Sequence, residues 1–326
     1  MAESVEARRS HPRPRPAAVH HAPSLGRRLK KNWDFYLFIS PFFVLFSVFG
    51  LFPILFSFYL SFTDWRGLGP IELKGLQNYA NLLTNDAFHE VILNTLILLV
   101  AARGSLVLVS LAVAFLFHVL RPRFDHFFRT IYFMPLLVST VAIAQIFVAM
   151  FDQHSGLINF LLSLPTGKEV SIGWLTQEEY AKLVVTLELY WRWFGWNIVF
   201  LVASMEAISV DIYDAAQVDG ANIWAVFRYI VVPLLKPVLV FVAVTSVIGG
   251  FEMFGEVFAI WGTNSGLGTS LGGPSNSAMT TAVYLYQAAF VWGSWGVGAA
   301  VSYLMFLMIA AFSYANYRMI TRGEAD

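Results

Sequence analysis

The chain has 326 residues, of which 57% are apolar and only 13% charged. Charged residues make up about a quarter of an ordinary soluble domain, so this composition excludes that class. The 21 basic residues balance the 21 acidic ones, which argues against a cationic surface for nucleic acid and predicts no nucleic-acid partner. The chain has no cysteine, which excludes disulfides, thiolate metal ligands and cysteine nucleophiles.

The first 31 residues form a basic, proline-rich head. They hold eight arginines and lysines and four prolines, but no apolar run that could form a core, so we expect a disordered head. His11, His20 and His21 lie there without fixed geometry, and we predict no metal site. The apolar stretch that follows is too long for a signal peptide, so we expect no cleavage.

Six apolar runs follow, between residues 32 and 326. A bilayer core about 30 Å thick needs roughly 20 apolar residues in helical form, and runs that are apolar throughout favour helices over barrel strands. The runs span Phe35–Phe62, Val91–Leu120, Ile131–Phe151, Leu183–Met205, Val238–Ile260 and Gly296–Tyr317. The sequence therefore predicts an all-α integral membrane protein with six transmembrane helices, the first kinked or tilted because it contains Pro41 and Pro53.

The lysines and arginines predict the orientation. Fifteen of the 21 fall in the head and in segments on the same side of the membrane. Four lie on the opposite side and two within the runs; these six are Arg66, Lys74, Lys168, Lys182, Arg103 and Arg192. Basic residues concentrate on the cytoplasmic side. We therefore expect a multi-pass protein of the cell (inner) membrane, in contact with the lipid bilayer, with both termini in the cytoplasm.

No pattern of an enzyme site occurs. A phosphate-binding loop would read G-x-x-x-x-G-K-[ST], but the one Gly-Lys pair, Gly167-Lys168, is followed by Glu169. Neither H-E-x-x-H nor G-x-S-x-G is present, and no histidines and carboxylates stand at ligand spacing within a run. We predict no catalytic residue, no metal and no cofactor bound by this chain.

The most informative polar segment is the cytoplasmic loop 206–237, between the fourth and fifth runs. Ser209 or Asp211 can cap a short helix, which Gly220 can end in the left-handed conformation. Asn222 can cap a second helix that runs to about Val232. Four residues would give this helix-turn-helix an apolar side: Ile212, Ala216, Phe227 and Ile230. Such a surface predicts a docking site.

At this loop the sequence resembles the sugar-type permease subunits, of the malF or ugpA kind, of bacterial binding-protein-dependent ABC importers. Their signature has E-A-A, then D-G-A, then a phenylalanine, an isoleucine and L-P. It stands here as Asp214-Ala215-Ala216, Asp219-Gly220-Ala221, Phe227, Ile230 and Val232-Pro233. Asp214 and Val232 depart from the pattern but keep its chemical type. The resemblance extends over nearly the whole chain after the head and implies the six-helix, type I permease architecture.

The resemblance implies that the loop inserts a coupling helix into a cleft of a separate ATPase subunit. ATP and Mg would then be bound by that partner, and the permease would work with a second homologous permease subunit, two ATPase subunits and an extracytoplasmic solute-binding protein. An alternative is that the amphipathic loop only seals the cytoplasmic end of the helix bundle.

Ionisable and polar residues within the runs are candidates for a substrate pathway. Glu252 and Glu256 are four residues apart and are expected to share a helix face; Trp191 and Asn197 are further candidates. Interhelical hydrogen bonding is the alternative for the glutamates, and an interfacial aromatic belt is the alternative for the tryptophans. Arg192 can pair with Glu188 within one helix. A G-G-P turn, Gly272-Gly273-Pro274, follows the fifth run.

These observations predict a permease subunit of an ATP-driven ABC importer that translocates a carbohydrate or polyol delivered by an external binding protein. The alternative is a secondary transporter that couples to an ion through Glu252 and Glu256. Inverted repeats would support that alternative, and we detect none.

Overall fold

The computed structural model describes residues 32–120, 125–263 and 270–321, without the side chains of a few residues in 125–129 and of Thr166. Within these ranges the backbone is helical between its turns, with two isolated bridges and no β-strand. This confirms the all-α prediction. The head, 1–31, lies outside the described residues, so its disorder stays a prediction.

The chain divides into two units, Met1–Leu55 and Phe56–Asp326. The first holds α2 (Trp33–Phe46), η1 (Ser47–Leu51) and the beginning of α3 (Phe52–Leu60). Pro41 lies inside α2, and η1 is a π-helical turn directly before Pro53. A wider turn is a usual local adjustment beside a proline, which donates no backbone hydrogen bond. No residue of α2 or η1 is buried.

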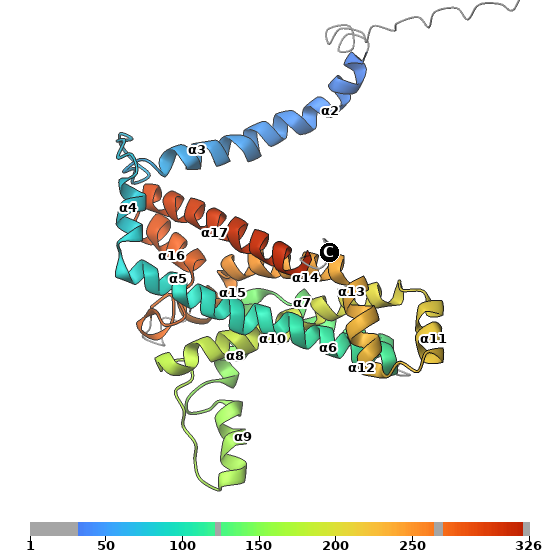
Figure 1. Cartoon of the computed structure of the whole chain (residues 1–326). Helices are drawn as coiled ribbons and strands as arrows, with labels where there is room; N and C mark the ends of the chain where they lie inside the picture. The colour runs from blue at the N-terminus through green and yellow to red at the C-terminus, as the bar shows by residue number, and fades with distance from the viewer. Residues whose placement is uncertain (1–31, 121–124, 264–269, 322–326) are drawn as a thin grey trace, which may run out of the picture. The chain divides into compact units, whose positions relative to one another are not determined.

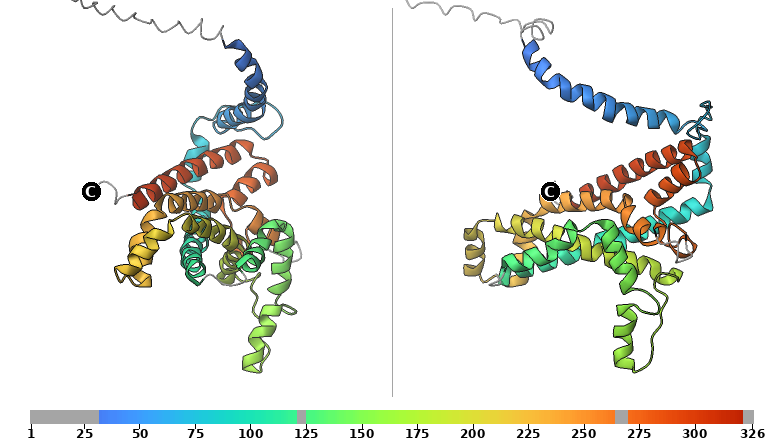
Figure 2. Two further views of the ribbon diagram at one scale, coloured as in Figure 1. Left: turned by 90° about the vertical axis from the view of Figure 1, so that its right-hand side faces the viewer. Right: turned by 180° about the vertical axis from the view of Figure 1, so that it is seen from behind.

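The second unit is a helical bundle (Figures 1 and 2). Its first half consists of α4 (Gln77–Leu83), α5 (Asp86–Leu98), η2 (Leu99–Gly104), α6 (Ser105–Leu120), α7 (Asp125–Leu137), α8 (Thr140–Met150), α9 (Leu157–Thr166) and α10 (Glu178–Glu206). Its second half consists of α11 (Val210–Val218), α12 (Ile223–Val226), η3 (Phe227–Val231), α13 (Val232–Leu234), α14 (Lys236–Phe251), α15 (Gly255–Val257), η4 (Phe258–Gly262), η6 (Pro274–Asn276), α16 (Thr281–Tyr286), η7 (Gln287–Val291) and α17 (Trp295–Thr321).

Three helices of the described chain are long and apolar enough to cross a membrane: Trp33–Leu60, Asp86–Leu120 and Trp295–Thr321. Two bent pairs raise that number to five if each pair is one span: Thr130–Leu137 with Thr140–Met150, and Ile223–Leu234 with Lys236–Phe251. The predicted fourth run lies in α10, a helix of 29 residues that carries Glu188 and Arg192. At about 1.5 Å per residue α10 is also long enough to cross the bilayer core.

The predicted third run, Ile131–Phe151, is helical but is bent into two helices. Its two halves, α7 and α8, meet at 106°. Ser139 begins α8 by accepting a hydrogen bond from the backbone N–H of Ala142, and Pro135 lies in the last turn of α7. The fifth helix is also shorter than predicted, because α14 ends at Phe251 and the chain turns through residues 252–254 before α15.

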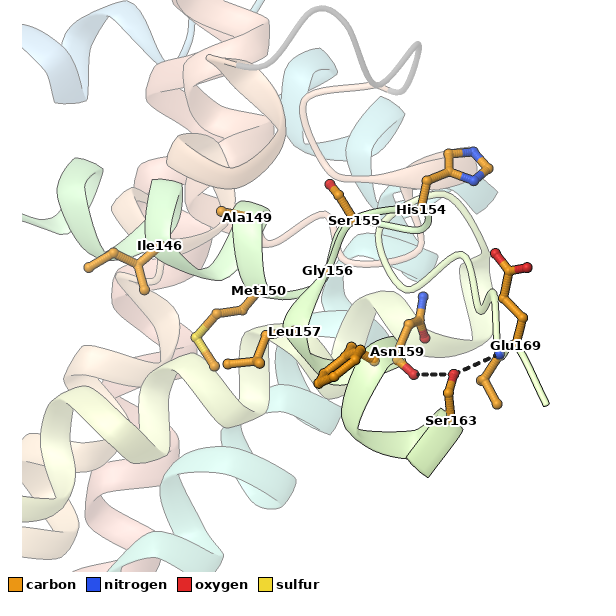
Figure 3. A pocket seen from close by; sticks show the side chains of 12 residues that line it. Ile146, Ala149, Met150, His154, Ser155, Gly156, Leu157, Asn159, Ser163 and Glu169 are labelled. Carbon is orange, nitrogen blue, oxygen red and sulfur yellow. Dashed lines mark hydrogen bonds between the residues drawn. The ribbon is translucent and has the colours of Figure 1, made fainter. Parts of the chain in front are cut away.

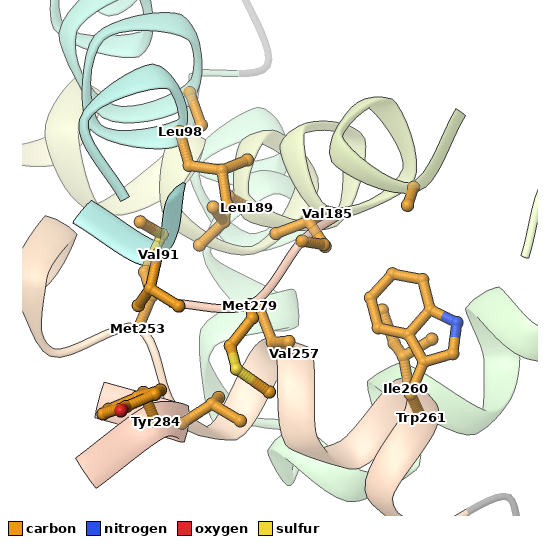
Figure 4. Packing of buried hydrophobic residues seen from close by; sticks show 14 of the residues in the cluster. Val91, Leu98, Val185, Leu189, Met253, Val257, Ile260, Trp261, Met279 and Tyr284 are labelled. Carbon is orange, nitrogen blue, oxygen red and sulfur yellow. The ribbon is translucent and has the colours of Figure 1, made fainter. Parts of the chain in front are cut away.

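The main core joins α5, η2, α8, α10, α14, η4, α16 and α17 (Figure 4). Leu98, Leu189 and Phe251 are fully buried within it. Glycine allows the closest helix approach: a Cβ on Gly195 of α10 would overlap the carbonyl oxygen of Tyr132 in α7. Broken helices can therefore pack tightly against the long α10.

Candidate functional site

The loop between α10 and α14 has the local structure that its sequence predicts. The hydroxyl of Ser209 accepts from the backbone N–H of Asp211 and begins α11. At the other end the N–H groups of Gly220 and Ala221 donate to the carbonyls of Gln217 and Ala216 over 3.0 and 2.9 Å. This is a Schellman ending, and Gly220 takes the left-handed conformation that it requires, at φ 75°.

The second half of the loop is anchored to the bundle. Asn222 caps α12 by accepting from the backbone N–H of Ala225 over 2.8 Å. The ring of Phe227 lies 4.7 Å from that of Phe115 in α6. A second core cluster, which includes Met205 and Val231, joins this region to α6 and α10. Of the remaining signature residues, Ile230 and Pro233 are half-buried. A displacement of the loop would therefore act on two long helices.

The exposed face of α11 is acidic and apolar. Asp211, Asp214 and Asp219 are exposed, as are Ala215 and Val218, the last at 88%. The predicted apolar side is only partly right. Ala216 is buried and Phe227 packs inward, whereas Ile212 is 40% exposed on the outer surface. Ile212 and Ala216 lie four residues apart in α11, so the helix is covered at Ala216 but not one turn earlier, where Tyr213 rather than Ile212 packs against the second core cluster.

A charge cluster, which we define as Arg103, Glu188, Arg192, Trp193 and Glu256, lies halfway along the long helices. Arg103 comes from η2, Glu256 from α15 and the other three from α10. Arg192 Nη1 is 3.7 Å from Glu256 Oε1, and Trp193 Nε1 donates to the same oxygen over 3.5 Å. The Arg103 guanidinium lies 4.5 Å from the centre of the Trp193 ring. The cluster joins three elements distant in sequence.

Burial makes these charges interdependent. Arg103, Glu188 and Glu256 are 7%, 0% and 7% exposed. Among the described residues, neither oxygen of Glu188 has a hydrogen-bond partner, nor has Nε of Arg103 or of Arg192. The helical pair of Glu188 with Arg192, which the spacing allows, does not form, because Arg192 reaches across to Glu256. Buried charges are tolerated when they compensate one another, and two arginines here face two glutamates.

The four predicted pathway residues do not form one site. Glu256 is in the charge cluster and Asn197 is buried in α10, but Glu252 is exposed where α14 ends and Trp191 is 43% exposed. The prediction that the two glutamates share a helix face is wrong, because the helix breaks between them at residues 252–254. Trp193, by contrast, packs inside the cluster rather than in an aromatic belt. A role for any of the four in transport stays a prediction.

Away from α11, the side chain of Asn159 in α9 forms hydrogen bonds with residues before and after that helix; we call Asn159 and these partners the Asn159 hub. The amide of Asn159 donates to the carbonyls of Gln153 and Ile172 over 2.9 and 3.0 Å, and its oxygen accepts from Trp174 Nε1 over 2.8 Å. Figure 3 shows the neighbouring hollow between α8 and α9, about 820 Å³. Among the residues that line this hollow, the hydroxyl of Ser163 accepts a hydrogen bond from the backbone N–H of Val170. In the described part of the chain no three His, Asp or Glu side chains gather as a metal site requires.

Comparisons with known proteins agree with the signature in the loop. The family model of the binding-protein-dependent transport system inner membrane component matches residues 107–322. The chain is 35% identical to the lactose transport system permease protein LacF of Rhizobium radiobacter, over 89% of this chain and 95% of that one. It is 32% identical to the arabinooligosaccharides transport system permease protein AraP of Bacillus subtilis, over 92% and 95%.

The fold is similar to that of a solved structure. A chain of the bacterial alginate ABC transporter, in complex with a periplasmic protein bound to an alginate pentasaccharide, matches with a TM-score of 0.76. The match covers 92% of this chain and 98% of that one, at 19% identity. The loop 206–237 and four of the five residues of the charge cluster fall in the segment that the family model matches; Arg103 precedes that segment.

Proposed function

The chain belongs to the family of binding-protein-dependent transport system inner membrane components, and on that premise we propose that it is a permease subunit of an ATP-driven importer of carbohydrates. The sugars named for its relatives, lactose and arabino-oligosaccharides, support this substrate class. The observation that carries the proposal is the exposed, signature-bearing helix α11, which is anchored by its neighbours to the long helices of the bundle.

Helix α11 docks into a cleft of an ATPase subunit. Its exposed surface offers three carboxylates and apolar side chains such as Val218, which suits a partner cleft with an apolar floor and basic rim. When ATP closes the ATPase pair, the displaced loop pushes on α6 through Phe227 and Phe115, and on α10 through the second core cluster. The permease itself binds no nucleotide; ATP and Mg act on the partner.

The full importer contains a second homologous permease, two ATPase subunits and an extracytoplasmic solute-binding protein. Both termini face the cytoplasm, on the side of α11. Because the chain has no cysteine, single cysteines test this directly: a cysteine at Ala2 should react only from the cytoplasm and one at Asn81 only from outside. Labelling of the Ala2 position from outside would overturn the orientation.

Proteoliposomes with ATP inside test energy coupling. The complete importer should take up lactose or arabino-oligosaccharides with its binding protein, and uptake should persist when the proton gradient is collapsed. Asp214→Lys should abolish uptake and release the ATPase subunit on purification, because it reverses charge on α11. Glu178→Lys, at an exposed position in the first turn of α10, is the matched control and should leave both unchanged.

The ion-coupled alternative predicts a different result. It requires Glu252 and Glu256 to bind an ion together, but Glu256 is held by Arg192 and Trp193, and Glu252 is exposed on the other side of the helix break. Uptake driven by an imposed proton gradient without ATP would support that alternative. Normal uptake by Asp214→Lys would instead show that the loop only seals the cytoplasmic end of the bundle.

A further inference from the structure

Helices α5 and α16 begin at the end of the bundle opposite α11 (Figures 1 and 2). Residues of both helices line a small cavity there. Its volume is about 180 Å³, and its lining includes Glu90, Asn94, Ser275, Tyr284, Gln287 and Trp292. A water molecule occupies about 30 Å³ of liquid, so the cavity has room for roughly six waters. That is the bulk of one sugar ring rather than of an oligosaccharide.

Two aromatic rings form one wall of this end cavity. Tyr284 and Trp292 meet edge to face, with ring centres 5.4 Å apart and planes at 87°. Tyr284 is buried against Phe88, whereas Trp292 is 52% exposed. The backbone N–H of Trp292 donates to the carbonyl of Gln287 across a π-helical turn. The indole is therefore held in place with much of its surface uncovered.

Polar groups without protein partners form the rest of the lining. Within the described chain no cation lies within 4 Å of the Glu90 carboxylate, and the side chains of Gln287 and Ser275 make no hydrogen bond. Asn94 donates to the carbonyl of Asn276 over 3.2 Å, and its own oxygen accepts nothing. Acceptors and donors are thus directed at solvent or at a ligand, unlike those of the Asn159 hub.

The G-G-P turn positions part of this lining. Ser275 and Asn276 both adopt positive φ, at 47° and 62°, directly after Gly273 at 84°. Consecutive non-glycine residues in this region are uncommon and strained, and such strain gathers at functional sites. It persists here because Gly272 lies so close to Met279 that a Cβ would overlap it, which fixes the turn against the bundle.

We propose that the end cavity is an entry site, which binds one neutral sugar ring before the substrate passes into the helix bundle. This inference rests on the proposed function. The apolar face of a sugar ring packs on an indole, while its hydroxyls bond to carboxylate, amide and hydroxyl groups. The single charge, on Glu90, repels acidic sugars and accepts from hydroxyl donors.

Direct binding tests the cavity without transport. The permease–ATPase complex in nanodiscs, without binding protein, is titrated with lactose, L-arabinose and D-xylose, and sugar binding is followed by saturation-transfer NMR. At least one sugar should bind saturably. Trp292→Ala should raise its Kd at least about tenfold, as expected for a central aromatic anchor. The isosteric Glu90→Gln should raise it about threefold or more. Trp33→Ala, at a tryptophan 61% exposed in α2, should leave it unchanged.

The outcomes separate this inference from the proposed function. No saturable binding of any of the three sugars, or an unchanged Kd in both cavity variants, overturns the sugar site. A weaker affinity for the binding protein in Trp292→Ala, with the sugar Kd unchanged, would make the cavity a protein-docking site and overturn the inference too. Sugar binding without ATP-driven uptake would refute the proposed function and leave the cavity assignment standing.

Discussion

The loop 206–237 and the charge cluster arrange their polar groups in opposite ways. In the loop, backbone groups pair within a few residues, as Gly220 does with Gln217, and the carboxylates remain in solvent. In the cluster, Arg103 and Glu256 are 153 positions apart in sequence yet both buried. Within the described chain, Nε of Arg103 and of Arg192 and both carboxylate oxygens of Glu188 have no hydrogen-bond partner. The loop depends on single residues for its shape, whereas the cluster depends on all of its charges at once.

Removing one charge from the cluster should produce the largest effect. Glu256→Leu leaves Arg192 without its carboxylate, and an uncompensated buried charge costs about 3–5 kcal/mol. The thermal unfolding midpoint of the purified complex should fall sharply. The double variant Arg192→Met with Glu256→Leu should regain most of that loss, because it removes the Arg192 charge together with its partner and leaves one cation and one anion, Arg103 and Glu188, in the cluster. A double variant as unstable as the single one would show that shape rather than charge holds this region.

A change at Gly220 should separate coupling from stability. Gly220→Val forces a β-branched residue into positive φ, at a local cost of about 1–3 kcal/mol. We expect normal membrane insertion but loss of the ATPase subunit on purification and loss of uptake. Gly167→Val is the matched control, because Gly167 also has positive φ, 61°, and open space around its Cβ. Equal losses in both variants would mean that strain alone, and not the docking surface, is responsible.

The Asn159 hub is intermediate between the loop and the cluster. Its hydrogen bonds join residues that are near in sequence, as in the loop, but Asn159 is buried, as the cluster is. Asn159→Leu removes the acceptor of Trp174 Nε1 and the donor to several carbonyls, and groups left unsatisfied in this way cost about 1–3 kcal/mol. Limited proteolysis should cleave residues 151–177 faster than in the wild type. Asn81→Leu, at an exposed asparagine whose side chain makes no hydrogen bond in the described chain, should not change the cleavage rate.

Asp152 should show the smallest effect. Its carboxylate accepts from the backbone N–H and hydroxyl of Ser155, which lowers its pKa from the ordinary value. A lowered folded-state pKa stabilises the turn above the unfolded pKa, about 4, and the gain is lost as the pH falls through the folded value. The protection of the amides of residues 152–156, measured as exchange relative to the intrinsic rate at the same pH, should thus fall only in acid, and Asp152→Asn should remove that dependence.

Signals that lie within a few residues of one another predict structure well. Ser209, Gly220 and Asn222 each form the cap or turn that their residue types favour, because the bonds involved close over two to five positions. The helical nature of the six apolar runs was predictable for the same reason. The breaks within these runs were harder to predict. Pro135 and Ser139 are residue types that favour the bend between α7 and α8, but a hydropathy pattern does not show it.

Pairings between distant residues were not predictable from local spacing. Arg192 is four residues from Glu188, yet its contact is with Glu256 of another helix. Charges of both signs were nevertheless visible within the apolar runs, which hold two cations, Arg103 and Arg192, and three anions, Glu188, Glu252 and Glu256. The membrane favours their neutralisation by one another. Composition could therefore suggest that a cluster exists, while only the fold assigns its contacts.

The close approach at Gly195 also limits how this protein can be altered. Because the main chain of α7 occupies the place where any Cβ would lie, even alanine at position 195 must push two backbones apart rather than rotate a side chain. Neighbouring aromatic side chains, such as those of Tyr132 and Phe194, can be replaced by others of similar volume. At position 195 the overlap is with backbone atoms, which no side-chain rotation can relieve. Libraries that vary the residues of α10 outside the charge cluster should therefore keep glycine at position 195.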